Sequence, residues 1–139
     1  MAPKGPKMLL VLDTSALLAM RGDEPGADEV ENILRRAKKG SVSVLASFMT
    51  RMELLYMIRR EEGEEEAREA LRLIDSFALE WVSCEPEILE AAAALKAEGR
   101  LSVADCWIAG TAAVRIATLV HKDPEFSRLA QIPQKFLGA

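Results

Sequence analysis

Short apolar segments of strand length alternate along this chain with longer segments whose apolar residues recur at helical spacing. Strands joined through helices need crossover connections, which place the strands parallel in one sheet and helices on both of its faces. The alternation therefore predicts an α/β fold, a three-layer α/β/α sandwich with a mostly parallel central sheet. The strand candidates are Met8–Leu12, Ser41–Ser47, LEWVSCE (79–85), ATLVHKD (117–123) and QKFLG (134–138).

Helices are expected between these strands, and turn residues mark several of their ends. Pro86 is suited to the first position of a helix that Gly99 then ends. At 139 residues the chain is long enough for one core, so we expect a single domain over residues 1–139, with residues 1–7 as a flexible N-terminal extension. The expected helices follow the turn at 22–26 as far as Lys39, and then cover Ser47–Arg60, Glu64–Ala78, Pro86–Glu98, Ser102–Ile116 and a short segment from Pro124.

Composition excludes several classes of protein. No apolar run approaches the roughly 20 residues of a membrane-spanning helix, and the start MAPKGPK lacks the apolar core of a signal peptide, so we expect a cytoplasmic protein without membrane contact. Cys84 and Cys106 form no C-x-x-C pair, and His121 is the single histidine, so neither a zinc site nor a disulfide framework is indicated. Oxygen ligands for a hard metal ion remain.

Acidic residues stand where such a sheet would bind a ligand. Asp13 directly follows the first strand, and Asp123 ends the strand ATLVHKD. The carboxyl ends of parallel strands lie at one edge of the sheet, where ligands bind, so we expect these two carboxylates to converge. Asp105 is a third candidate, near the start of a helix.

Each aspartate also has a purely structural interpretation. Asp13 is a favoured residue for capping a helix, and Asp123 precedes Pro124 as a cap would. Asp105 lies three residues after Ser102, a spacing that resembles a capping box. From the residues alone, capping and function remain open for all three.

Capping does not explain Glu53, which lies inside the helical segment TRMELLYMI beside Met52 and Leu54. An unpaired carboxylate in an apolar neighbourhood is costly. Several carboxylates brought together repel one another unless a divalent cation neutralises them. Mg²⁺ or Mn²⁺ binds such oxygen ligands and supports phosphodiester cleavage. The acids therefore favour a metal-dependent hydrolase.

Net charge argues against an overall attraction to nucleic acid, because the chain carries −4 and has a sequence pI of about 5.1. Local clusters of cations matter more than the total. The candidates for binding RNA phosphates beside the acids are Arg51, Arg59, Arg60, Lys96 and Arg100.

Four segments together resemble the PIN-domain ribonucleases, and most of all the VapC toxins of prokaryotic toxin–antitoxin pairs. They are VLDTSALLAM, MELLYMIRR, LSVADCWIAG and ATLVHKDPEF, and their order matches the family's order of strands and helices over about Leu9 to Phe126. The resemblance implies an Mg²⁺- or Mn²⁺-dependent endoribonuclease that cleaves RNA. Asp13 and Asp105 would be the main metal ligands, with Glu53 and Asp123 completing the catalytic cluster directly or through water.

The resemblance also implies supporting residues and partners. Ser15 matches a polar residue that orients the cluster, whereas His121 departs from the family's frequent threonine. Glu125 fits either an auxiliary acid or an acid of a helix first turn. A homodimer and a VapB-like antitoxin are the implied protein partners.

Two other functions are weighed against this one. A haloacid-dehalogenase-type phosphatase would need a second aspartate two residues after Asp13, where this chain has Ser15. The alternative from another class is a non-catalytic PIN-like module that binds RNA or protein and uses its acids as caps.

Overall fold

A sheet of five parallel strands forms the centre of the computed structural model, which describes residues 7–138. The strand order is β3-β2-β1-β4-β5, so the first strand lies in the middle of the sheet. Of the expected extension at residues 1–7, all but Lys7 lies outside the described residues. The strands are β1 (Met8–Leu12), β2 (Val42–Ser47), β3 (Leu79–Val82), β4 (Thr118–His121) and β5 (Gln134–Phe136).

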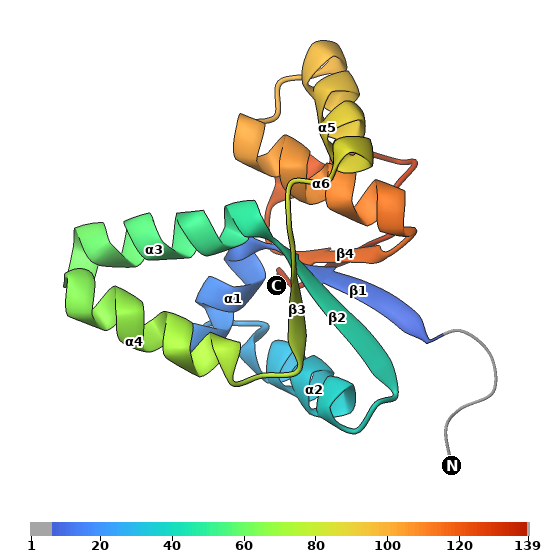
Figure 1. The fold of residues 1–139 in the computed structure, drawn as a ribbon. Coiled ribbons are helices and arrows are strands. Elements are labelled where there is room, and N and C mark those ends of the chain that lie inside the picture. Colours follow the sequence, from blue (N-terminus) through green and yellow to red (C-terminus); the bar gives the residue numbers. More distant parts are fainter. Residues whose placement is uncertain (1–6, 139) are drawn as a thin grey trace.

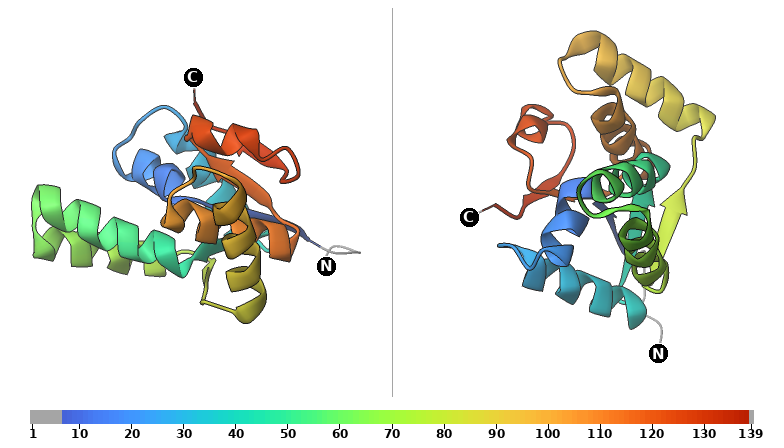
Figure 2. Two further views of the ribbon diagram at one scale, coloured as in Figure 1. Left: turned by 90° about the horizontal axis from the view of Figure 1, so that it is seen from above. Right: turned by 90° about the vertical axis from the view of Figure 1, so that its left-hand side faces the viewer.

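Helices cover both faces of this sheet, as Figures 1 and 2 show, and the predicted three-layer α/β/α fold is confirmed. Four helices lie on one face, and two helices with a short 3₁₀ helix lie on the other. The first layer holds α1 (Thr14–Arg21), α2 (Ala27–Lys38), α3 (Phe48–Glu62) and α4 (Glu64–Asp75), and the second holds α5 (Pro86–Glu98), α6 (Val103–Arg115) and η1 (Pro124–Arg128).

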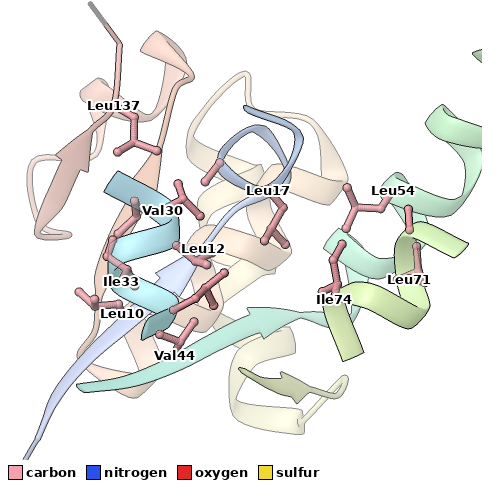
Figure 3. Packing of buried hydrophobic residues seen from close by; sticks show 14 of the residues in the cluster. Leu10, Leu12, Leu17, Val30, Ile33, Val44, Leu54, Leu71, Ile74 and Leu137 are labelled. Atoms are coloured by element: carbon pink, nitrogen blue, oxygen red, sulfur yellow. The ribbon is translucent and has the colours of Figure 1, made fainter. Parts of the chain in front are cut away.

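Alternation along the strands divides the core into these two layers. Leu10 and Leu12 of β1 face the first layer, whereas Val11 between them faces the second. Figure 3 shows the strand leucines beside Val30 and Ile33 of α2. The sequence thus supplies an apolar residue to both faces of β1, as a central parallel strand requires.

Two glycines allow a turn between helices and a close contact between helices, respectively. Gly63 has a φ of 101°, a left-handed conformation, and it joins α3 to α4, which extend together beyond the sheet in Figure 1. Gly110 of α6 lies against α5, where an added Cβ would be 3.1 Å from the backbone nitrogen of Ala92. Ala92 of α5 therefore packs closely against α6, whereas Ala93 and Ala94 on the same helix are exposed.

No helix within residues 7–138 has both the length and the apolar character needed to cross a membrane.

Candidate active site

Asp13 lies where β1 ends and α1 begins, next to the carboxyl end of β4. Its backbone N–H donates to Val120 O over 3.2 Å, which continues the pairing between the two strands. Its carboxylate accepts from the Ala16 N–H at 2.8 Å and so caps α1. Asp13 is thus both a cap and, at 3% exposure, a buried acid at the ligand-binding edge of the sheet.

Burial dominates the electrostatics of Asp13. Removal from water raises the pKa of this carboxyl from 3.8 to about 7, although hydrogen bonds from Ser15 and Ala16 act in the opposite direction. The negative charges of Asp105 and Asp123 raise this pKa further. The ionised Asp13 carboxylate therefore destabilises the metal-free protein, and a nearby cation would reduce this cost.

Ser15 connects the ends of β1 and β4 through hydrogen bonds. Its hydroxyl donates to the Asp13 carboxylate, whose oxygens lie 2.7 and 2.8 Å away. The same oxygen accepts from the Lys122 N–H at 2.9 Å. Ser15 thereby ties Asp13 to the segment that carries Asp123.

Asp105, Asp123 and Glu125 form the densest group of acids in the described part of the chain. One carboxylate oxygen from each lies within 4.8 Å of the others. Asp105 comes from the first turn of α6, Glu125 comes from the first turn of η1, and Asp123 precedes η1 and accepts from the Glu125 N–H at 2.9 Å. Partial burial, followed by the charges of Asp123 and Glu53, raises the pKa of Asp105 to about 6.

Asp105 and Asp123 differ in how they take part in helix capping. Ser102 caps α6 by accepting from the Asp105 N–H at 3.1 Å, so the bond uses the backbone of Asp105 and leaves its carboxylate in the acidic group. Asp123 itself caps η1 through the Glu125 N–H. Glu125 lies both in the first turn of η1 and in the group of acids, so its place in that turn does not account for all of its surroundings.

Glu53 is held at the site by a residue that the sequence analysis did not single out. Thr14 Oγ1 donates to Glu53 Oε1 at 2.7 Å and lies 3.2 Å from the hydroxyl of Thr50. Both threonines are buried. Thr14 adjoins Asp13 and begins α1, so the hydroxyl beside a candidate acid was the signal that could have identified it.

His121, the departure from the family pattern, lies buried at the end of β4. Its Nδ1 accepts from the Asp123 N–H at 3.1 Å, and its Nε2 therefore carries the hydrogen that Gln134 Oε1 accepts at 2.8 Å. Gln134 Nε2 donates to the carbonyl oxygens of Phe126 and Leu129, at 2.7 and 2.9 Å. This chain of hydrogen bonds fixes the backbone on which Asp123 and η1 depend.

Two of the five basic residues proposed to bind RNA, Arg51 and Arg60, contact aromatic rings of the protein itself. Nη1 and Nη2 of Arg51 donate to the Asp75 carboxylate at 2.7 and 2.9 Å, and Arg51 Cζ lies 5.1 Å from the centre of the Trp81 ring. Arg60 lies over Tyr56, with 5.3 Å between its Cζ and the ring centre. These contacts give both residues a structural explanation.

The other three basic residues, Arg59, Lys96 and Arg100, differ in the contacts that they make within the protein. Arg59 is 3.8 Å from Glu64, a long and exposed ion pair. Lys96 Nζ donates to Leu101 O at 2.8 Å and so holds the turn between α5 and α6. Arg100 lies exposed in that turn and belongs to none of the ion pairs or side-chain hydrogen bonds found within residues 7–138.

The arrangement suits a hard divalent cation. Every candidate ligand is a carboxylate oxygen, and the pKa values of Asp13 and Asp105 are raised partly because the acids repel one another. Mg²⁺ and Mn²⁺ prefer such ligands and would remove that repulsion. The donor set thus fits the metal that the sequence suggested.

A family model for the PIN domain matches residues 10–132, and the chain belongs to this family. No curated protein sequence gave a match to the chain.

Solved structures share this fold at low sequence identity. VapBC2 from Rickettsia felis, bound to a DNA fragment from its promoter, is 22% identical with a TM-score of 0.77, covering 93% of this chain and 98% of that one. VapBC-1 from nontypeable Haemophilus influenzae is 22% identical with a TM-score of 0.73, covering 94% and 98%. VapC20 from Mycobacterium tuberculosis, a toxin that cleaves the sarcin–ricin loop, is 15% identical with a TM-score of 0.67, covering 87% and 95%.

Proposed function

We propose that this chain is an Mg²⁺- or Mn²⁺-dependent endoribonuclease and the toxin of a VapBC-type toxin–antitoxin pair. The observation that carries the proposal is the gathering of Asp105, Asp123 and Glu125 within 4.8 Å, beside the buried Asp13. Membership of the PIN domain family and the likeness to an RNA-cleaving toxin support the nuclease activity. The likeness to VapBC complexes supports an antitoxin partner.

The side chains have distinct roles in this proposal. Asp13 and Asp105 hold the cation, with Glu53 and Asp123 completing the site directly or through water. Glu125, which lies within 4.8 Å of Asp105 and Asp123, is an auxiliary acid. Ser15 orients Asp13 through its 2.7 Å hydrogen bond. When bound, a divalent cation supplies charge stabilisation at the scissile phosphate and lowers the pKa of the attacking water.

Energetic cost argues against acids that act only as caps. Serine or asparagine would cap α1 as well as Asp13 does, without a buried charge. The raised pKa of Asp13 means that the ionised carboxylate opposes folding at neutral pH. A site that binds a cation explains why an acid occupies this position, and we therefore prefer it to the non-catalytic binding module.

Cleavage of a structured RNA by the purified full-length protein tests the proposal. We expect cleavage with Mn²⁺ or Mg²⁺, none with EDTA, and recovery when the cation is restored in excess. Asp105→Asn should abolish cleavage, whereas Asp28→Asn, which changes an exposed acid of α2, should retain it. Cleavage that survives both EDTA and Asp105→Asn, in a preparation free of other nucleases, would contradict the proposed function.

The proposal implies two further properties. RNA is found in the cytoplasm, so the reaction belongs in that compartment. We also propose a homodimer, which light scattering on the purified chain would test, a monomer at all concentrations being the contrary result.

A further inference from the structure

Beside the acidic cluster lies a cavity of about 610 Å³ that the proposed metal site does not use. One wall is the end of α5 and the turn that leads into α6, which carries Asp105. The other wall is η1 and the segment after it, and Glu125 belongs both to this wall and to the acidic cluster. The cavity therefore adjoins the acidic cluster through Glu125, which lies within 4.8 Å of Asp105 and Asp123.

Two arginines line this cavity from opposite walls, Arg100 in the turn and Arg128 at the end of η1. Both are exposed, and neither takes part in an ion pair or a side-chain hydrogen bond with another residue of the described range 7–138. The ion pairs found there use other arginines, namely Arg21, Arg51, Arg59, Arg68, Arg72 and Arg115.

The remaining lining offers both apolar contact and a group that can read a base. Leu101 and Leu129 contribute apolar surface, and Gln131 contributes an exposed amide with both donors and acceptors. Glu98 also lines the cavity, and together with Glu125 it balances the formal charge of the two arginines. The cavity volume lies within the range of small-molecule sites, so a nucleotide can enter it.

We propose that this cavity binds the nucleotide next to the scissile phosphate of a single-stranded RNA. Arg100 and Arg128 each bind one of the two backbone phosphates that flank it, the base packs on Leu101 and Leu129, and Gln131 contacts the edge of the base. The inference rests on the proposed nuclease function, because only a bound RNA strand would continue from the acidic cluster into this cavity. Single-stranded RNA is favoured over duplex because its bases are free to turn outward.

Two other structural features support this placement. Lys96 donates to Leu101 O at 2.8 Å and so fixes the turn that presents Arg100. Gln134 donates to the carbonyls of Phe126 and Leu129, and so fixes the segment that presents Arg128. Both arginines thus extend from backbone that is held in place.

A larger cavity of about 720 Å³, between α2 and α4, lies in the other helical layer, away from the acidic cluster.

Binding of a labelled single-stranded RNA of about ten nucleotides tests the proposal separately from cleavage. The Asp105→Asn background keeps the strand intact, and fluorescence anisotropy gives Kd as a function of salt. Each phosphate contact contributes about 0.7 to the slope of log K against log salt. Replacing both Arg100 and Arg128 with glutamine should therefore reduce the slope by about 1.4 and raise Kd about 25-fold near 0.1 M salt.

A matched control removes two positive charges from the opposite layer. Replacing both Arg35 and Arg36 with glutamine changes two exposed arginines of α2 and should leave Kd nearly unchanged. An equal loss in this control would show that overall charge, and not the cavity, attracts RNA, and it would overturn the proposal. Unchanged Kd in the double variant would overturn it as well.

Two further outcomes distinguish the cavity proposal from the nuclease function, and a third tests the cavity alone. If the wild-type protein cleaves RNA while the double variant binds and cleaves as well as it does, the cavity proposal fails and the function stands. If the wild-type protein never cleaves but the double variant loses binding as stated, the cavity binds RNA and the nuclease function fails. A free nucleoside monophosphate that binds as tightly as the strand would contradict a site built for a continuous chain.

Base contact has its own test in Gln131→Ala. This substitution should change which nucleotide is preferred beside the cut, as read from the ends of the products. An unchanged preference would refute the role of Gln131.

Discussion

Replacing Asp13 with asparagine should stabilise the metal-free protein, although it removes a residue proposed to be essential. The amide keeps a carbonyl oxygen that accepts from the Ala16 N–H, so the cap of α1 is preserved. It removes a carboxylate whose pKa is raised from 3.8 to about 7, chiefly by burial. The substitution thus separates the cost of the charge from the benefit of the cap.

The pKa values set the size and the sign of the effect. Because the folded-state pKa is the higher one, Asp13 stabilises the fold fully below about pH 4 and loses this contribution as the pH rises to about 7. The interval corresponds to roughly 4 kcal/mol. Burying the amide nitrogen offsets part of this, so we expect a gain of roughly 2–4 kcal/mol at about pH 8 and below about 1 kcal/mol at about pH 4.

Urea unfolding in EDTA, at both pH values, measures this difference. Asp28→Asn is the matched control, because it removes an exposed acid from the first turn of α2 and should cost about 0.5 kcal/mol at about pH 8. Loss of stability for Asp13→Asn at about pH 8, or an equal gain at both pH values, would refute the argument that burial of this charge opposes folding.

Three further substitutions test how the site and its supports are held. Gln134→Leu removes the amide that links His121 to two backbone carbonyls, so urea unfolding should show a free energy of unfolding lower by about 2–4 kcal/mol. Calorimetry should show Mn²⁺ binding about tenfold weaker, and unchanged Mn²⁺ affinity would contradict the positioning role of Gln134. Ile116→Gly should add about 0.5–1 kcal/mol of stability, because this residue is 87% exposed and has a φ of 52°, and any loss in thermal melting would count against strain there. Gly110→Ala should cost about 1–2 kcal/mol in unfolding experiments, since crowding against Ala92 outweighs the gain in helix propensity, and a gain would show that α5 moves away freely.

Much of the fold could be predicted because its signals are local. The strand Met8–Leu12 and the helix Pro86–Glu98 have the predicted bounds, since an acid, a proline and a glycine mark their ends. The helix expected over Glu64–Ala78 ends at Asp75, because the chain turns before β3, although Phe77 continues the apolar spacing. Where a helix yields to a turn depends on tertiary contacts that the spacing does not contain.

The candidate site could be predicted in part for the same reason. Asp13 and Asp123 were found from their places at strand ends, a rule that needs only the parallel sheet. The place of Glu125 in the cluster depends on the turn of η1 toward α6, which the sequence pattern leaves open. Arg51 is paired with Asp75, a residue 24 positions away, and the composition of its own segment gave no sign of that partner.

Isothermal titration calorimetry of Mn²⁺ with the 139-residue chain tests directly whether these carboxylates form a divalent-metal site. At about pH 6.5 we expect saturable binding that releases protons from Asp13 and Asp105, whose pKa values are raised. Comparing buffers of different ionisation enthalpy detects these protons. Binding should be lost in Asp105→Asn and retained in Asp28→Asn. Absence of saturable binding to the folded wild-type protein, or equal binding to Asp105→Asn, would contradict the account.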